Sequence, residues 1–254
     1  MNGQMYQIAK IVVAAKKAMQ TNAQIQYELV MGENSVQFQF LPEKWLFGTR
    51  SHTAKTVAEW FEQVRKNGLR DVMLFGPSRV ENRFLLGFVN TTESAILCFY
   101  ENGKVSYFMP NWEFDRPKKG WNVLYTEKEW PNPPEGKPCY EDNTESFRQI
   151  LVDIRQFARE IGSNIFANVF GHAISVLDGE NEDPDKKPFL DLPKHNLRII
   201  EAASIADVFG GMSSWNDDPH VMAQEKGLTR EYDLLSDELL KNIRLAIMYA
   251  INEW

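Results

Sequence analysis

The sequence from Leu228 to Trp254 reads LTREYDLLSDELLKNIRLAIMYAINEW and has the spacing of one long amphipathic helix. Apolar residues recur along it at steps of three or four: Leu228, Tyr232, Leu235, Leu239, Ile243, Ile247, Ala250 and Trp254. Such steps place side chains on one face of a helix, and that face is stable in water only when another element covers it. The stretch therefore predicts a docked final helix.

Earlier segments of the C-terminal half have the same helical periodicity. Residues 142–161 begin with a capping-box-like spacing of Asp142 and Glu145 and continue as an apolar face from Phe147 to Ile161. Residues 166–177 form a second apolar face, which stops at Gly179. Residues 204–209 predict a short helix, whereas 197–201 fit either a helix or a strand. This half is expected to be rich in helices.

The N-terminal half predicts a sheet with two helices, at residues 4–20 and 53–67. Gly-Glu-Asn at 32–34 and Asn-Gly at 102–103 have the composition of hairpin turns. Only one helix interrupts the strand-like runs, so we expect a mainly antiparallel sheet and an α+β fold. The runs rich in β-branched and aromatic residues lie at 24–30, 35–40, 45–47, 72–75, 83–89, 95–100, 105–109 and 122–126.

A proline-rich segment separates the two halves. Residues 130–138 read WPNPPEGKP, and four prolines in nine residues exclude both a helix and a central strand. We therefore expect an α+β part over residues 1–130 and a mainly helical part over 139–254. The two parts can be separate domains or can pack as one.

The charge of the chain is unevenly distributed. Residues 1–138 carry 17 Lys and Arg against 14 Asp and Glu, a net charge of +3, whereas residues 139–254 carry 11 against 21, a net charge of −10. An acidic half repels phosphate backbones, and the other half is too weakly basic for a nucleic-acid footprint. The pattern argues against nucleic acid as a partner, and it fits either a solvated surface that aids solubility or a contact surface for a basic protein.

The sequence predicts a cytoplasmic protein without a membrane partner. Lys10, Lys16 and Lys17 interrupt the apolar N-terminal run, which makes it a poor secretory signal. No stretch has 18 uninterrupted apolar residues. The two cysteines, Cys98 and Cys139, do not make a disulfide framework for 254 residues.

The loop WNDDPH is the first candidate site, and it contains Trp215, Asn216, Asp217, Asp218 and His220. A carboxylate near an imidazole is the raw material of general acid-base chemistry. Asn, Asp and Pro also form turns, and Trp215 would equally serve to anchor such a turn on the core. Both interpretations remain open from the sequence.

A second candidate lies where tryptophans and basic residues alternate. Trp and Arg are enriched at recognition surfaces, so this region predicts an interface, with cover for one end of the sheet as the other interpretation. Its members are Trp112, Trp121 and Trp130, with Arg116, Lys118 and Lys119.

No metal, cofactor or catalytic motif is predicted. Residues 178–185 hold five carboxylates, but the spacing of an EF-hand loop would require glycine where Asp183 stands and glutamate where Phe189 stands. The chain has no HExxH motif, no Gly-x-Ser-x-Gly motif and no glycine-rich phosphate loop. Cys98, between Leu97 and Phe99, fits a small core residue.

The leading expectation is a non-enzymatic protein-binding module that uses its acidic half or its Trp-rich region as the contact surface. An immunity-type inhibitor of a basic toxin is one concrete version. A hydrolase or metal-dependent enzyme whose site is assembled only in the fold is an alternative, and a small-ligand binding protein is another. The sequence leaves the oligomeric state open.

Overall fold

A computed structural model describes residues 3–45, 48–50, 52–87, 90–91, 93–130, 133, 136–180, 189–210 and 213–254. The chain forms two compact units. The sheet unit comprises Gln4–Phe75 and Thr92–Pro138, and the helical unit comprises Met1–Gly3, Gly76–Thr91 and Cys139–Trp254.

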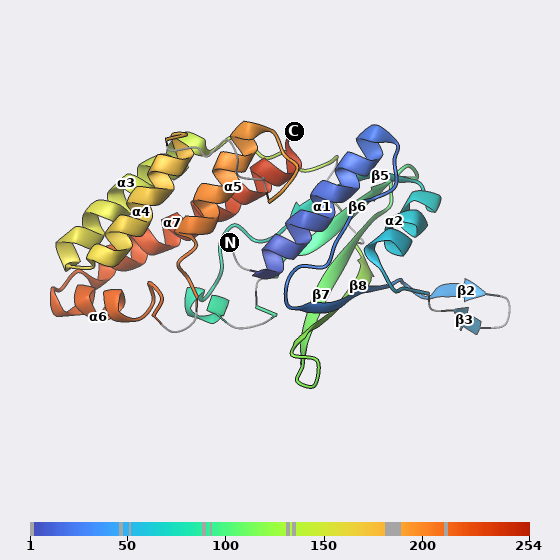
Figure 1. Cartoon of the computed structure of the whole chain (residues 1–254), viewed down its shortest axis with the longest axis horizontal. Helices are drawn as coiled ribbons and strands as arrows, with labels where there is room; N and C mark the ends of the chain where they lie inside the picture. Colours follow the sequence, from blue (N-terminus) through green and yellow to red (C-terminus); the bar gives the residue numbers. More distant parts are fainter. Residues whose placement is uncertain are drawn as a thin grey trace. The chain divides into compact units, whose positions relative to one another are not determined.

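The sheet unit is built on six strands in the order β4-β1-β8-β7-β6-β5 (Figure 1). Every neighbouring pair is antiparallel except β1 and β8, which run parallel. The expectation of an α+β fold with a mainly antiparallel sheet is therefore confirmed. The strands are β1 (Glu33–Gln39), β4 (Thr53–Ala54), β5 (Leu69–Phe75), β6 (Ala95–Tyr100), β7 (Val105–Asp115) and β8 (Gly120–Glu129), with a separate pair β2 (Glu43–Trp45) and β3 (Gly48–Arg50).

Two helices, α1 (Gly3–Thr21) and α2 (Val57–Lys66), cover one face of this sheet. Phe38 and Tyr125 are register neighbours on β1 and β8 and point to the same face. The Phe38 ring stacks on Trp60 of α2 at 4.8 Å, and the Tyr125 hydroxyl donates a hydrogen bond of 2.7 Å to Gln7 of α1. These contacts place the core of the unit between the sheet and its two helices.

The predicted hairpin between residues 24–30 and 35–40 is wrong. Residues 23–30 form no strand, and Ile25 is their one fully buried apolar side chain. Strand β1 pairs instead with β4 on one side and with β8 on the other. Strand β8 pairs with β1 along one edge from Glu33 to Gln39, and β4 pairs with Phe38 and Gln39 at the other edge, so the partners of β1 come from later segments of the chain.

The predicted strand over residues 83–89 is also wrong within the described residues. Arg83–Gly87 form a 3₁₀ helix, η1, in the helical unit. Strands β5 and β6 pair directly, with Phe75 opposite Ala95, so the residues between them leave the sheet. An apolar run next to a strand was mistaken for another strand because periodicity does not show which edges are free.

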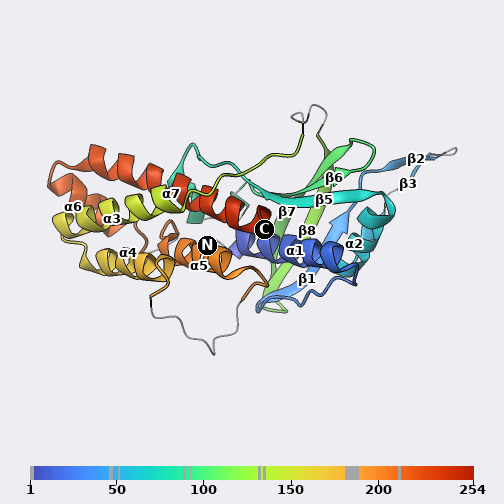
Figure 2. The ribbon, with the colours of Figure 1, turned by 90° about the horizontal axis from the view of Figure 1, so that it is seen from above.

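The helical unit packs α3 (Thr144–Ile161), α4 (Asn164–Leu177), α5 (Lys194–Ala206) and α7 (Thr229–Asn252) side by side, as Figures 1 and 2 show. Helix α3 contacts α4 and α7, and α5 contacts the same two helices. The short helix α6 (Asp218–Glu225) packs against α3 and α7. The ambiguous segment 197–201 is helical, and α5 continues to Ala206 in place of a separate helix over 204–209.

The final helix α7 confirms the predicted amphipathic stripe. Its buried members are Tyr232, Leu239, Ile243, Ile247 and Ala250.

The neighbouring helix α3 ends at Gly162, which has a φ of 90°. This is the left-handed C-cap conformation that glycine adopts most readily. Among the helices of the described ranges, none has the length and the apolar composition that a bilayer crossing needs.

Candidate functional site

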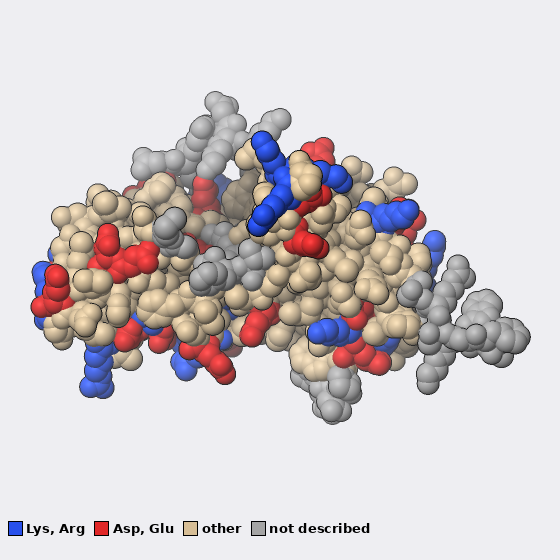
Figure 3. Space-filling model, turned by 90° about the horizontal axis from the view of Figure 1, so that it is seen from below, with Lys and Arg blue, Asp and Glu red and all other residues tan. Residues whose placement is uncertain are grey.

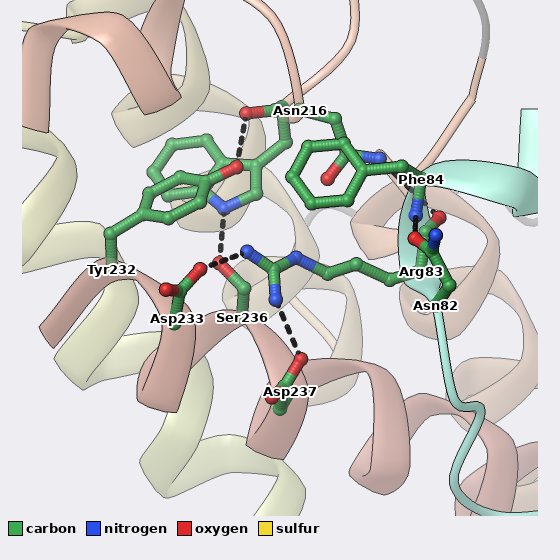
Figure 4. Close-up of polar contacts among 9 residues, drawn as sticks. Asn82, Arg83, Phe84, Asn216, Tyr232, Asp233, Ser236 and Asp237 are labelled. Atoms are coloured by element: carbon green, nitrogen blue, oxygen red, sulfur yellow. Dashed lines mark hydrogen bonds and ion pairs between the residues drawn. The ribbon is translucent and has the colours of Figure 1, made fainter. Parts of the chain in front are cut away.

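Three segments of the helical unit that lie far apart in the sequence meet around Arg83 (Figure 4). They are η1, the loop that leads into α6, and the first turns of α7. We call this group the Arg83 cluster, and its members are Arg83, Phe84, Trp215, Asn216, His220, Tyr232, Asp233, Ser236 and Asp237.

The guanidinium of Arg83 is 7% exposed and forms ion pairs with two carboxylates of α7. One nitrogen lies 2.5 Å from Asp233 and the other 2.7 Å from Asp237. The guanidinium also lies 5.0 Å from the Phe84 ring centre and 5.2 Å from that of Tyr232. Burial lowers the pKa of Arg83, but the hydrogen bonds to the carboxylates outweigh burial and raise it. The group is therefore a permanent, bound cation.

Trp215 is fully buried and fastens the loop to α7. Its indole nitrogen donates to Ser236 Oγ at 2.8 Å, and the Tyr232 hydroxyl donates to the Trp215 carbonyl at 2.7 Å. The two rings stack at 5.5 Å, and burial raises the pKa of Tyr232 to about 12. Phe166 and Phe170 of α4 meet the indole edge to face. A side chain held in this way is not available to contact a partner.

The polar residues of the loop divide between buried and exposed positions. Asn216 is buried and donates to the Arg83 carbonyl at 3.5 Å. Asp217 accepts a hydrogen bond from the Ser214 amide at 2.9 Å, and both Asp217 and Asp218 are exposed. The ring of His220 packs on Phe84 and Tyr232, at 5.8 and 5.2 Å. In the described part of the chain no hydrogen bond joins this imidazole to a carboxylate, so the loop holds no preformed acid-base pair.

Two exposed apolar side chains, Phe84 and Leu85, lie on η1, and no sequence pattern indicated them. Phe84 is 43% exposed and Leu85 is 49% exposed. The side chains of Asp233 and Asp237 are 47% and 68% exposed although they hold Arg83. We call these residues and the loop carboxylates the Phe84 surface: Phe84, Leu85, Asp217, Asp218, Asp233 and Asp237. It was missed because residues 83–89 resemble a strand.

Trp112, Trp121 and the basic residues of the Trp-rich candidate lie at the turn end of the β7–β8 hairpin in the sheet unit, whereas Trp130 lies at its other end, where its amide donates to the Val105 carbonyl. Phe114 pairs with Trp121 across the strands, and Trp112 meets Trp121 edge to face at 6.0 Å. Phe114 is 48% exposed, whereas the two tryptophans are half-buried. Lys118 approaches Asp115 within 4.0 Å at the turn. The hairpin therefore presents an aromatic cluster beside a charged turn.

No metal centre is formed by the described residues, because they contain no grouping of three or more His, Cys, Asp or Glu that could hold an ion. In the acidic stretch 178–185, Asp178 is bound by Arg148 through two hydrogen bonds of 2.8 Å. Residues 181–185 lie outside the described residues. Cys98 is buried and Cys139 is exposed, and both are free thiols.

Charged side chains are spread over the helical unit on the face that Figure 3 shows. Acidic groups occur across this face with basic groups among them. The net charge of −10 over residues 139–254 thus does not gather into one broad patch there. Charge can direct a partner to this unit only through local groups such as the Phe84 surface.

The comparisons with known proteins give no independent assignment. No family model, no curated protein and no solved structure matches this chain.

Proposed function

We propose that this chain is a non-enzymatic protein-binding module that binds a basic protein through the Phe84 surface. The observation that carries the proposal is an exposed aromatic side chain with carboxylates around it. Phe84 is 43% exposed, beside Asp233 and Asp237. Aromatic residues within a polar rim are the usual anchors of protein interfaces.

The fixed position of Phe84 supports its role as an anchor. Its amide donates to Asn82 Oδ1 at 3.0 Å, and its ring rests on His220 and on the Arg83 guanidinium. A side chain that is already ordered loses little conformational entropy on binding. Arg83 and Trp215 are buried beneath the surface and fix its segments through their contacts with α7, so neither of them needs to touch the partner.

The charge of the same unit supports a basic partner. Asp233 and Asp237 contribute two carboxylates through Arg83, which contacts Phe84, and Asp217 and Asp218 contribute two more from the segment whose His220 packs on Phe84. Asp233 and Asp237 are already paired with Arg83, so the unpaired field comes mainly from Asp217 and Asp218. Opposite fields accelerate association and salt screens them. An immunity-type inhibitor of a basic toxin would fit this description.

We place this function in the cytoplasm. Cys98 and Cys139 are free thiols, which is the usual state of cysteine in a reducing compartment.

The test is affinity capture from the source cells, followed by binding kinetics with the captured protein. Phe84→Ala should raise the dissociation rate at least about tenfold, as the loss of an interface anchor does. The paired substitutions Asp217→Lys and Asp218→Lys should lower the association rate and reverse its salt dependence. Ile165→Ala is the matched control, because Ile165 is 77% exposed on α4 of the same unit.

The proposal fails if the Phe84 and Asp217/Asp218 variants bind like the Ile165 control. It also fails if affinity capture from the source cells yields no protein. That outcome would favour the alternatives, an enzyme or a small-ligand binding protein.

A further inference from the structure

A pocket of about 660 Å³ opens in the sheet unit, and no residue of the Phe84 surface lines it. It lies between the C-terminal end of α2, the turn that joins β6 to β7, and the end of β8. Its walls include Phe40, His52, Tyr100 and Glu127, with Lys104 and Glu129 also lining it. A pocket of this volume matches a small organic molecule.

The carboxylate of Glu127 is the unusual feature of the pocket. Glu127 is 8% exposed, and each of its oxygens accepts one hydrogen bond from a neutral donor. The Ser106 hydroxyl donates at 2.7 Å, and the Leu41 amide donates at 3.0 Å. Among the residues whose side chains the structure describes, which do not include Lys44 and Arg50, no lysine or arginine forms an ion pair with it.

A buried carboxylate held by neutral donors is costly, because neutral hydrogen bonds replace only part of its hydration. The two donors satisfy half of the four lone-pair positions of a carboxylate. Acceptor capacity therefore remains at a residue that lines the pocket. A charged donor is the group that this capacity suits best.

The other walls suit the same chemistry. The Phe40 ring and the His52 ring lie 5.3 Å apart, and Phe40 is buried while His52 is exposed. Tyr100 is buried, and its hydroxyl lies 3.4 Å from Ser106 Oγ, next to the Glu127 carboxylate. Aromatic rings attract an organic cation through cation–π contact, and a carboxylate beside them forms an ion pair with the same cation.

We propose that this pocket binds a small organic cation, with a guanidinium or primary ammonium head group paired to Glu127. The aromatic rings of Phe40 and Tyr100 hold the adjoining carbon atoms. Glu129 and Lys104 also line the pocket and carry opposite charges, so Glu127 supplies the excess negative charge that a cation meets. The site is independent of the proposed protein-binding function, because it uses no residue of the Phe84 surface.

Calorimetric titration with butylguanidinium and with butylurea tests the proposal, because these two probes have the same shape and differ in charge. Butylguanidinium should bind at millimolar or lower concentration, and butylurea at least about tenfold more weakly, since the charge-assisted bond is lost. N-acetylarginine amide and N-acetylcitrulline amide form a second pair. Binding by this pair alone would identify a protein side chain as the source of the cation.

Glu127→Gln keeps the size of the side chain and should weaken butylguanidinium at least about tenfold. Glu113→Gln is the control, because Glu113 is exposed on β7 and does not line this pocket. His52→Ala is a second variant that changes an exposed wall residue, so the site can still be tested if the Glu127 variant unfolds. Equal affinity for the charged and neutral probes overturns the proposal, and so does the absence of binding by all four probes.

Discussion

Arg83 and Asp237 are 154 positions apart in the sequence, and their side chains form an ion pair of 2.7 Å. The two partners differ in environment, because Arg83 is 7% exposed and Asp237 is 68% exposed. The carboxylate keeps most of its hydration while it neutralises a buried cation. This arrangement avoids much of the desolvation cost that two buried charges would carry.

Replacing the cation should destabilise the helical unit. Arg83→Met keeps an unbranched apolar side chain but removes the guanidinium that lies over Phe84 and Tyr232, and it leaves Asp233 and Asp237 one helical turn apart without this counterion. We expect a loss of about 2 kcal/mol in the free energy of unfolding, the usual size for charged hydrogen bonds. Urea denaturation measures it, with the exposed Glu231→Gln on the same helix as the control. A variant as stable as the wild type would show that the pair contributes nothing.

Removing residues 251–254 should destabilise the protein by roughly 3 to 5 kcal/mol, as the loss of a large buried side chain does. Ile251 is fully buried, and the Glu253 carbonyl accepts a hydrogen bond of 3.2 Å from Asn196. Glu253 Oε1 also accepts from the Tyr140 amide at 3.1 Å. Thermal unfolding of the truncated chain tests this, and an unchanged melting temperature would contradict it.

Stability should decrease in acid through Asp142. Burial raises the pKa of this carboxyl, but the hydrogen bonds from Thr144 and from His195 outweigh burial and lower the pKa below its ordinary value of 3.8. A pKa that is lower in the folded state adds stability above the unfolded-state value. That contribution disappears as the pH falls through the folded-state value.

The measurement compares Asp142→Asn with the wild type in urea at neutral pH and at successively lower pH. The difference in stability should be largest at neutral pH and should vanish in acid. Asp218→Asn, at an exposed position of α6, is the control. A difference that stays constant down to about pH 3 would exclude Asp142 as the titrating group.

The two thiols should react very differently. Burial, with a smaller effect from the nearby Glu127, raises the pKa of the Cys98 thiol far above its usual range, whereas Cys139 is exposed. The thiolate is the reactive form, so iodoacetamide should modify Cys139 in the native protein and Cys98 only after denaturation. Peptide mass spectrometry distinguishes the two sites. Equal labelling under native conditions would mean that the β6 region opens readily.

Calcium should leave the melting temperature unchanged. The carboxylate of Asp178 is already bound by Arg148, which also lowers the pKa of that carboxyl through the hydrogen bonds it donates. A ligand that binds only the native state must raise the melting temperature. A clear increase at micromolar calcium would show that residues 178–185 form a specific cation site after all.

Local patterns predicted the helices well because the apolar residues that a helix buries recur at a fixed step within its own segment. The faces of α3 and α7 follow a step of three or four residues, and Phe147, Ile154, Ile243 and Ile247 are buried as that step requires. Each of these helices satisfies its backbone within itself. Its position along the chain therefore does not depend on a distant partner.

The strands were predicted less well because each strand needs the backbone of another strand as its hydrogen-bonding partner, and that partner can be distant in the sequence. Residues 24–30 alternate like a strand but form none, and β1 pairs instead with β8, which follows it by more than 80 residues. The candidate site shows the same limit. Trp215 and Asp217 were identified from their loop, but Arg83 and Phe84, which complete the surface, were assigned to a strand.

The sequence by itself determined the α+β class, the final helix and the burial of Cys98, since these depend on periodicity and composition within single segments. Only the tertiary structure decided that Trp215 is an anchor inside the helical unit, that Phe84 is the exposed aromatic beside it, and that Glu127 lines a pocket. Each of these facts depends on contacts between segments from 21 to more than 150 residues apart. No periodicity records such contacts, because the free energy of an ion pair or a buried hydrogen bond depends on distance in space.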